Sequence, residues 1–463
     1  MTTAASQAER LTVAMNRFGL GAKPGDPIPA DAERWLIDQF DRYEPTPPAF
    51  ERALPGADIA DQFSEGRMAL RGGDATAKMA ARKELRQNGQ ALYRDEVQMR
   101  ARSALDTDTP FVERLVHFWS NHFAVSADKL PVTVLAGAFE REAIRPNVLG
   151  NFEDMLLAVV RHPAMQLFLD QIRSVGPNSP MAQNSGERRN RRKPGINENL
   201  AREIMELHTL GVRTGYTQAD VTQFALALTG WNVRGLGAGA NAERPGGFAY
   251  RPRLHEPGQR DILGKSYADT GEEQAGAVLH DLATHDATAA HIATKLARHF
   301  IADEPPAATI RTLAAAYTSS GGDLKAVYAA LVAMPEAWAA QPVKFKSPWE
   351  WTISSLRGLG FERPDMPIAP LLNQLGQPVW RPGSPAGYDD AAASWAAPDA
   401  LVRRVEAAQR IVGKAPVELD ARQLAPELLP GTLSDLTRRE IGRAESGPTA
   451  LALLLVSPDF QRR

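Results

Sequence analysis

Cysteine is absent from the sequence, and its absence excludes several kinds of site at once. Disulfide bonds, zinc–thiolate sites, iron–sulfur clusters and a thiol nucleophile all require the sulfur of this residue. A chain without cysteine is compatible with both oxidising and reducing compartments, so the absence does not assign a location.

An excess of charge of either sign is also missing. The 53 Lys and Arg residues nearly balance the 55 Asp and Glu residues, which gives a net charge of −2. Proteins that bind nucleic acids or anionic membranes usually carry a clear basic surplus. We therefore expect no nucleic acid partner and no binding to a charged membrane surface.

Long apolar runs are missing as well. No window approaches the roughly 18 apolar residues that a transmembrane helix needs, so we expect no membrane span. The sequence begins MTTAASQAER and lacks the basic start and apolar run of a secretory signal. We therefore expect a cytoplasmic protein.

What the chain does contain is typical of a large globular protein. Apolar residues make up 43% of its 463 residues, and charged residues make up 23%. Helical spacing of apolar residues recurs along most of the chain, including the stretches 75–105, 111–124, 152–161, 218–229, 287–301 and 398–412. We predict a mostly α-helical protein, formed either by one large helical domain or by two packed helical lobes.

Evidence for β-strands is confined to one region. The segments 248–251 and 261–264 flank a turn at Pro257-Gly258, which predicts a minor β-hairpin near 248–263 or a pair of short extended segments. Two long irregular stretches, 174–196 and 232–247, are typical of functional lids or disordered connections. The first contains a basic run at 188–193, which either contacts phosphate or a polyanionic glycan or forms a solvated loop.

Five segments in a fixed order carry a family resemblance. They are NRFGLGA at 16–22, FWSNHF at 118–123, NENLAREIMELHTLGV at 197–212, LTGW at 228–231 with HEPG at 255–258 and ILG at 262–264, and LGQP at 375–378 with Pro382 and Trp395. With these segments the sequence resembles the domain-of-unknown-function 1800 family. We interpret the similar region, 14–460, as one family domain, or as two lobes, 14–173 and 197–460, joined by the basic loop 174–196.

The resemblance implies little about chemistry. It points to uncharacterised bacterial proteins to which no reaction is assigned. Many members carry export signals, which would place them in the periplasm. Many are encoded beside a second family that resembles sulfatases and alkaline phosphatases, so the resemblance implies such a protein as a functional partner.

The segment 197–212 supplies the first group of candidate residues. Asn197 is expected to cap a helix over 198–210, whose apolar residues share one face with His208 beside them. The other face gathers polar side chains, namely Asn199, Arg202, Glu203 and Glu206. This face is either solvated, with an Arg202–Glu206 ion pair, or part of a buried network in which a glutamate acts as acid, base or metal ligand.

Histidines supply further candidates. His122, beside Asn121, lies on the apolar side of the helix 111–124 and is either a hydrogen-bonded core residue or part of a site. Glu113 and His117 have a spacing compatible with metal binding, but the two-histidine motif of metalloproteases is missing, and we expect His117 to be exposed. His255 precedes Glu256 in a turn, where it is either exposed or the base or ligand of a site.

A looser group of histidines occurs on two successive predicted helices. It contains His280, His285, His291 and His299. Three or four histidines can bind zinc or copper, but this group lies outside the segments that carry the resemblance. Phosphate-binding loops and nucleophile elbows are missing, which leaves the cofactor unassigned, with a divalent metal as one candidate.

Two function hypotheses follow. The first is a hydrolase-like enzyme with the catalytic candidates Glu203, Glu206, His208, His122 and His255 and the substrate-binding candidates Asn121, Asn197, Asn199, Arg202, Trp231 and Glu256. The second is a non-catalytic binding or assembly protein, in which the same residues form a buried structural network.

Overall fold

The computed structural model describes the chain except for residues 1–5, 27–28, 71–73, 186–194, 237–245 and 416–418. The basic run at 188–193 and most of the Gly-rich stretch 232–247 therefore lie outside the described residues. The described part is mostly helical, as the sequence predicts, and it contains two small antiparallel sheets.

Helices follow one another along nearly the whole chain. The first half contains α1 (Gln7–Thr12), α2 (Ala32–Ile37), α3 (Gln39–Arg42), α4 (Gly56–Ala69), α5 (Ala75–Asp106), α6 (Pro110–His122), α7 (Leu130–Phe139), α8 (Phe152–Arg161), α9 (Pro163–Phe168), α10 (Pro180–Ser185), α11 (Asn199–Glu203) and α12 (Gln218–Ala227). The second half contains α13 (Glu272–Ala283), α14 (Asp286–Phe300), α15 (Ala307–Ser319), α16 (Leu324–Val332), α17 (Pro348–Gly358), α18 (Ile368–Gln374), α19 (Ala392–Trp395), α20 (Pro398–Val412), α21 (Ala421–Leu428), α22 (Asp435–Arg443) and α23 (Gly447–Val456).

Local capping chemistry explains where several helices begin. Asp74 accepts a hydrogen bond from the backbone of Ala77 at the start of α5, and Pro110 occupies the first position of α6. Ser347 and Glu350 form a capping box at the start of α17. These signals depend only on neighbouring residues, which is why the predicted and observed helices begin within a few positions of each other.

The segment 197–212 departs from its predicted form. The helix expected over 198–210 consists of α11 followed by a π-helical turn, Ile204–His208, and it ends there. The hydroxyl of Thr209 donates to the carbonyl of Ile204 (2.7 Å) where the chain leaves the helix. A π-turn contains more residues than an α-turn, so the faces drawn with α-helical spacing shift, and His208 is buried while Leu207 is only half-buried.

The strands form two separate pairs. Strand β1 (Trp231–Val233) pairs with β2 (Phe248–Tyr250), and β3 (Arg260–Ile262) pairs with β4 (Lys265–Tyr267). Both segments predicted near 248–263 contain strands, but each pairs with a different partner. Leu263 and Gly264 form the loop between β3 and β4 with φ angles of 52° and 76°, as a two-residue hairpin loop of type I′ requires.

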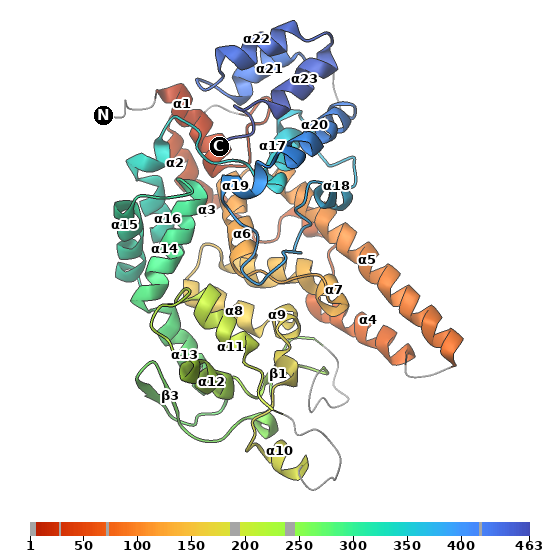
Figure 1. Ribbon diagram of the computed structural model, residues 1–463, viewed down its shortest axis with the longest axis vertical. Helices are drawn as coiled ribbons and strands as arrows, with labels where there is room; N and C mark the ends of the chain where they lie inside the picture. The colour runs from red at the N-terminus through yellow and green to blue at the C-terminus, as the bar shows by residue number, and fades with distance from the viewer. Residues whose placement is uncertain (1–5, 27–28, 71–73, 186–194, 237–245, 416–418) are drawn as a thin grey trace.

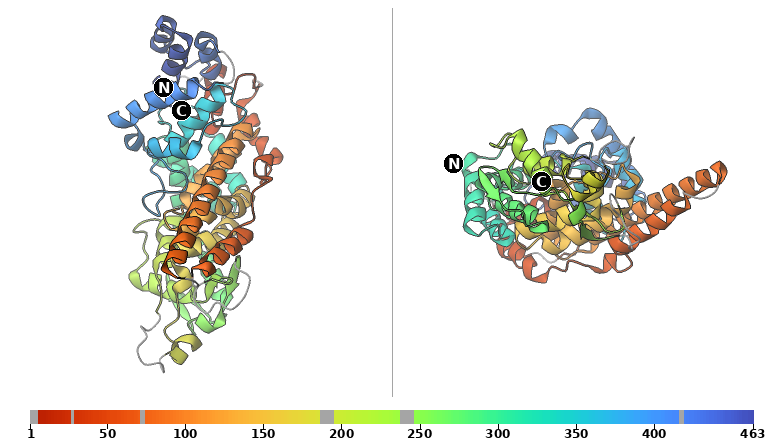
Figure 2. Two further views of the ribbon diagram at one scale, coloured as in Figure 1. Left: turned by 90° about the vertical axis from the view of Figure 1, so that its right-hand side faces the viewer. Right: turned by 90° about the horizontal axis from the view of Figure 1, so that it is seen from below.

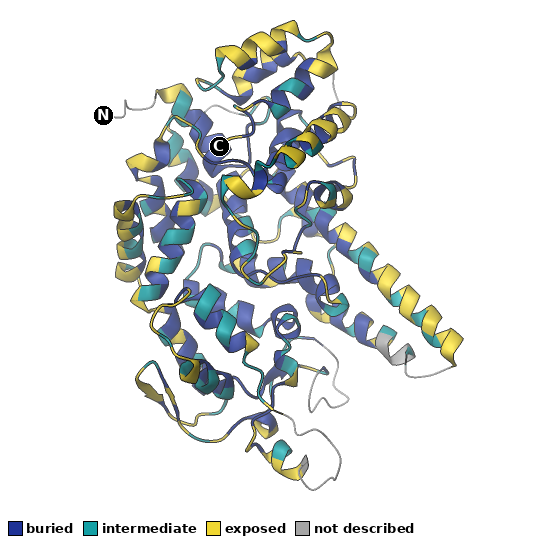
Figure 3. Cartoon of the chain, in the orientation of Figure 1, coloured by how far each residue is buried: buried dark blue, intermediate teal, exposed yellow. Residues whose placement is uncertain are grey.

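The helices are arranged around α6, which lies near the middle of an elongated molecule (Figure 1). Helices α14–α16 flank one side of it, α4 and α5 project as an arm on the other side, and α20–α23 form one end. The view from below shows the same arm standing out from the body (Figure 2). Nearly all residues of α6 and α17 are buried, whereas the outer half of α5 is exposed (Figure 3).

The hydrophobic core of the described chain is one continuous cluster that extends from Leu11 to Phe460. No helix among the described residues combines the length and the apolar character that crossing a lipid bilayer would require.

Candidate functional site

A cavity of about 420 Å³ adjoins the central helix α6. Its walls are formed by α6 and the residues 124–125 after it, α14, the start of α17 and the loop 377–390, together with Leu20, Leu207 and Arg100 from α5. The polar residues of the two long helices that line it are Arg114, His117, Ser120, Asn121 and His122 from α6, and His291, Lys295, Arg298 and His299 from α14. Volumes of this size are typical of small-molecule sites.

On α14, three cavity residues lie one helical turn apart. His291, Lys295 and His299 have i, i+4, i+8 spacing, which places them on one face of the helix. This face lies opposite α6, so the cavity receives an amine and imidazole groups from α14 and further imidazole groups from α6.

Hydrogen bonds define which nitrogen of two cavity histidines carries the proton. Nε2 of His122 bonds to the carbonyl of His208 (3.1 Å), and Nε2 of His291 bonds to the carbonyl of Leu207 (3.0 Å). A carbonyl only accepts, so Nε2 is the donor in both rings and Nδ1 holds a lone pair. Burial and nearby Lys295 lower the pKa of His291 to about 4 and that of His122 well below its usual value, so both rings are neutral near pH 7.

His299 pairs with a buried carboxylate. Its Nδ1 lies 2.6 Å from Oδ2 of Asp390. Burial alone would raise the pKa of Asp390, but His299, Arg463 and Lys344 lower it to about 2, so the carboxylate is ionised. Nδ1 therefore donates, and the buried Nε2 of His299 has no hydrogen-bond partner among the described residues. A base oriented in this way by a carboxylate is a common component of catalytic sites.

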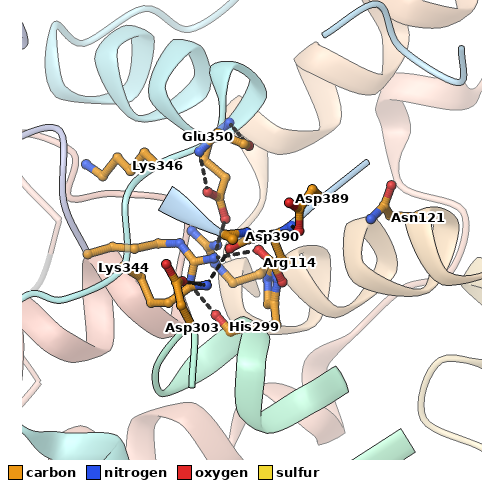
Figure 4. Close-up of polar contacts among 12 residues, drawn as sticks. Arg114, Asn121, His299, Asp303, Lys344, Lys346, Glu350, Asp389 and Asp390 are labelled. Atoms are coloured by element: carbon orange, nitrogen blue, oxygen red, sulfur yellow. Dashed lines mark hydrogen bonds and ion pairs between the residues drawn. The ribbon is translucent and has the colours of Figure 1, made fainter. Parts of the chain in front are cut away.

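Two further carboxylates beside the cavity, Glu350 and Asp303, are paired with cations (Figure 4). Asp389 instead accepts hydrogen bonds from the hydroxyl of Ser394 and from backbone N–H groups. Glu350 forms ion pairs with Arg114 and with Arg463, the latter at 2.9 Å. Burial alone would raise the pKa of Glu350, but these two arginines outweigh it and hold the pKa well below the usual value. Figure 4 shows Asp390 next to Arg114, with Glu350 on one side and His299 on the other. Lys344 contacts both Asp303 and the carbonyl of Asp390.

Lys295 is a cavity cation that lacks a partner of this kind. It is half-buried in the cavity wall and makes no ion pair or hydrogen bond with any residue that the structure describes. Burial lowers the pKa of its ammonium group to about 8, against the opposing effect of Asp390. The group therefore remains mostly protonated at neutral pH and gives the cavity a positive charge that no described residue pairs with.

The loop 377–390 is fixed to the helices beneath it. The side-chain amide of Asn121 donates to the carbonyl of Tyr388 (2.8 Å) and accepts from its backbone N–H (2.7 Å). Gly387, with φ of 82°, lies so close to α6 that a Cβ atom there would be 2.3 Å from the carbonyl oxygen of Asn121. Tyr93 donates to the carbonyl of Val379 (2.8 Å), so the cavity wall is held from several directions.

A family described as "Protein of unknown function (DUF1800)" matches residues 13–462. The chain belongs to the DUF1800 family. The family that the five sequence segments indicated is thereby confirmed, and the match covers nearly the whole chain. Comparisons with curated proteins and with solved structures gave no match.

Four of the five segments of this DUF1800 protein contribute to the cavity, since Leu20 of the first segment and Leu207 of the third also line it. Residues of 118–123 line it from α6, and Gln377, Pro378 and Pro382 line it from the loop. Asn121 and His122 are therefore the two predicted site residues that the cavity contains. His208 lies directly behind His122, with ring centroids 6.2 Å apart, but outside the cavity lining.

The polar face of the segment 197–208 lies elsewhere. Arg202 pairs with Glu198 (3.3 Å) and not with Glu206 as one interpretation expected. Glu203 is half-buried, and burial and the nearby Glu206 raise its pKa. The amide of Asn197 donates to the carbonyls of Leu169 and Asp170 and its oxygen accepts from the exposed Asn199. None of these side chains belongs to the cavity lining, and their proposed roles stay predictions.

The candidates of the turn at 255–256 form a third group, around strands β1 and β2. His255 is only 6% exposed, and its Nδ1 lies 2.8 Å from the carbonyl of Thr229, so the interpretation of an exposed turn histidine is wrong. The carboxylate of Glu256 accepts from the backbone and side chain of Asn178 (2.7 and 2.6 Å). Trp231 is buried and donates to the carbonyl of Glu272 (3.3 Å).

Of the four histidines in the looser group, only two line the cavity. His291 and His299 line the cavity, whereas His280 is exposed and contacts Glu153, and His285 caps α14. No set of three or more His, Asp or Glu side chains in the described residues is placed to hold a metal ion. The expectation that His117 is exposed is also wrong: its side chain is 10% exposed because Trp349 covers it and donates to its Nδ1 (3.2 Å).

Several cavity residues were not recognised from the sequence as candidates, namely Lys295, Asp390, Glu350 and Arg114. The spacing of His291, Lys295 and His299 is a signal that could have been found. The spacing Ser347-x-x-Glu350 is typical of a capping box, but nothing in the spacing along the chain connects Glu350 with Arg114 or Asp390 with His299.

Proposed function

We propose that this DUF1800 protein is an enzyme that acts on a small anionic molecule in the cavity. His299 serves as the general base and Lys295 holds the anionic group. The observation that carries the proposal is the 2.6 Å pairing of His299 with ionised Asp390 in the wall that also presents the uncompensated Lys295. An oriented base beside an unpaired cation is costly for a fold and useful for a reaction.

Hydrolysis is the reaction that this arrangement supports best. Nε2 of His299 accepts a proton from a water molecule while the water oxygen attacks the substrate, and the imidazolium then returns the proton to the leaving group. Asp390 keeps the ring in the orientation that leaves Nε2 free and stabilises the charge that forms on it. The ammonium of Lys295 attracts the anionic substrate and holds it beside the base.

The test uses chromogenic substrates and matched variants. The substrates are p-nitrophenyl acetate, mono-p-nitrophenyl succinate and p-nitrophenyl phosphate, which differ in charge and in the bond that breaks. The variant His299→Asn keeps a donor near the position of Nδ1, and so keeps Asp390 satisfied, while it removes Nε2. His280→Ala removes an exposed histidine of the neighbouring helix α13 and serves as the control.

We expect turnover of an anionic substrate by the wild-type protein and by His280→Ala, and a loss of about 10²–10⁴-fold in kcat for His299→Asn. In Lys295→Met the KM for the anionic substrates rises. Because Lys295 has a pKa of about 8, kcat/KM falls above that pH in the wild type and not in Lys295→Arg. Turnover by His299→Asn at the wild-type rate, or no turnover of any of the three substrates, would refute the proposal.

A non-catalytic binding or assembly protein is the second candidate. The pairing of Asn197, Arg202 and Glu256 with neighbouring groups supports a structural role for those residues. In this case the three substrates remain unchanged, and partner proteins are retained by the wild-type protein on an affinity column. A cytoplasmic location and a partner of the sulfatase-like or alkaline-phosphatase-like kind stay predictions, which cell fractionation and co-purification test.

A further inference from the structure

Arg100 is a second cation in the cavity lining, and it is held in an unusual way. Its side chain is 8% exposed, and its Nε donates to both carboxylate oxygens of Glu140 (3.0 and 2.8 Å). The central carbon of its guanidinium lies 4.2 Å from the centre of the Trp349 ring and 5.5 Å from the centre of the Trp380 ring. Trp380 itself donates to Glu140 (2.9 Å), so the group is fixed on three sides.

The terminal amino groups of Arg100 are the part that remains available. They donate no hydrogen bond to any residue within the described ranges, and they are absent from the fully enclosed polar atoms that lack a partner. Since Arg100 is otherwise buried and lines the cavity, these amino groups face its interior.

A guanidinium fixed in this manner matches one chemical group better than others. Its two amino groups form a planar fork that binds both oxygens of a carboxylate through parallel hydrogen bonds. The two tryptophans and Glu140 already restrict the side chain, so little conformational freedom is lost when a ligand binds. The charge of Arg100 is compensated by Glu140, so this position selects for the shape of a carboxylate more than for negative charge alone.

Arg100 and Lys295 lie at two ends of a run of contacts along the cavity wall. Arg100 packs on Trp349, the neighbour of Glu350; Glu350 contacts Arg463, and Arg463 lies 3.6 Å from Asp390. Asp390 in turn pairs with His299, one helical turn from Lys295. The helices that carry the two cations, α5 and α14, lie on opposite sides of α6 (Figure 1). His299, the base of the proposed reaction, thus lines the same cavity as the donor fork of Arg100 and the ammonium group of Lys295.

We infer that the natural ligand of the cavity is a small molecule with two anionic groups, a carboxylate that binds the amino groups of Arg100 and a second carboxylate or similar anion that binds Lys295. The inference names the substrate class of the proposed enzyme and rests on that proposal for the reaction, although the binding itself requires no turnover. The part of the ligand between its two ends would lie near His299.

Calorimetric titration with simple diacids tests the inference. The ligands are malonate, succinate, glutarate and adipate, each compared with the monocarboxylate of the same chain length, propionate to hexanoate. We expect at least one diacid to bind at least about tenfold more tightly than its matched monoacid, as one charge-assisted contact can provide. One chain length should be preferred, because the two cations are held at a fixed separation.

Two variants identify the cations, and a third is the control. Arg100→Lys keeps a positive charge beside Glu140 but removes the fork, and Lys295→Met removes an ammonium group on which no fold contact depends. Each of these two variants should bind the diacid no more tightly than the matched monoacid. Arg102→Ala, which removes an exposed arginine of α5 paired with Asp106, should leave the affinity for the diacid unchanged. Thermal unfolding of each variant checks that it is folded.

The outcomes separate this inference from the proposed function. If no diacid binds more tightly than its monoacid, or if both Arg100→Lys and Lys295→Met keep the preference, the inference is wrong even when an anionic ester is hydrolysed with the help of His299. If diacids bind through Arg100 and Lys295 and His299→Asn binds them equally well, the inference holds, even when no substrate is turned over and the proposed reaction fails.

Discussion

The buried ion pair between Glu113 and Arg145 allows the sharpest quantitative prediction about the fold. Arg145 is 0% exposed and donates to both oxygens of Glu113, one of them at 2.9 Å. The pair adjoins Glu140 and Arg100 in the wall behind the cavity, since Arg145 also lies 3.9 Å from Glu140. Removing one member leaves a buried charge without its partner, and such losses typically cost about 3–5 kcal/mol.

The perturbation is Arg145→Met, which keeps the volume of the side chain and removes its charge. We expect the free energy of unfolding to fall by about 3–5 kcal/mol at pH 7. The double variant Glu113→Leu/Arg145→Met removes both charges, so it should cost less than Arg145→Met alone. The coupling between the two positions should be at least about 2 kcal/mol, within the range measured for residues of one network.

The pH dependence provides an independent check with a definite sign. In the wild type, Arg145 and His117 outweigh burial and lower the pKa of Glu113 below that of the unfolded chain, so this group stabilises the fold above the unfolded pKa and loses that effect as the pH falls. Without Arg145, burial raises the pKa of Glu113 above its unfolded value. The deficit of Arg145→Met should therefore shrink as the pH is lowered from 7 toward 5.

The assay is urea unfolding followed by the fluorescence of the eight tryptophans, with midpoints compared at similar slopes. The control is Arg34→Ala, which removes the exposed i, i+4 pair with Asp38 (3.6 Å) and should cost less than about 1 kcal/mol. A cost below about 1 kcal/mol for Arg145→Met, or a double variant whose cost equals the sum of the two single variants, would contradict the reasoning.

Three further predictions concern other buried groups. Lys346 is 1% exposed, and burial lowers its pKa to about 7. Because the unfolded chain binds more protons than the folded one between pH 7 and 10, the stability of the wild type should rise there by up to about 1.4 kcal/mol per pH unit. The urea midpoint of Lys346→Met should lack this rise and should exceed that of the wild type at pH 7. Burial lowers the pKa of His208 to about 3, so stability should fall as the pH drops from 6.5 toward 4, and an unchanged acid slope in the thermal unfolding of His208→Leu would count against this reasoning. Gly387→Ala places a methyl group against the backbone of Asn121, so it should lower the free energy of unfolding by about 1–3 kcal/mol and weaken diacid binding in calorimetry. A variant as stable as the wild type would show that the loop is free to move.

The helices were accessible from the sequence because their signals are local. The periodicity of 75–105 and 287–301 predicts α5 and α14, and Pro110 and the Ser347–Glu350 box mark helix starts that the structure contains. The same local reasoning failed at 204–208, because a π-turn shifts the faces that α-helical spacing assigns. Family membership was accessible for a similar reason, since it rests on short strings of neighbouring residues.

The cavity could be predicted only in part. Asn121 and His122 were identified through the segment 118–123, and the spacing of His291, Lys295 and His299 was visible without its meaning. The partners of these residues come from far along the chain: Asp390 is 91 positions from His299, and Glu350 is 236 positions from Arg114. Spacing along one helix shows which side chains share a face, but not which other element covers that face.

By itself, then, the sequence determined the helical class, the boundaries of several helices and the family, all of which depend on interactions between neighbouring residues. The tertiary structure decided which polar residues meet. It covered His117 with Trp349 and buried His255 against the carbonyl of Thr229. Within the described ranges, it also gave each cavity carboxylate a partner of opposite charge or a hydrogen-bond donor, and it left Lys295 with neither. Burial and partners set the charge of each group, and both arise only when distant segments pack together.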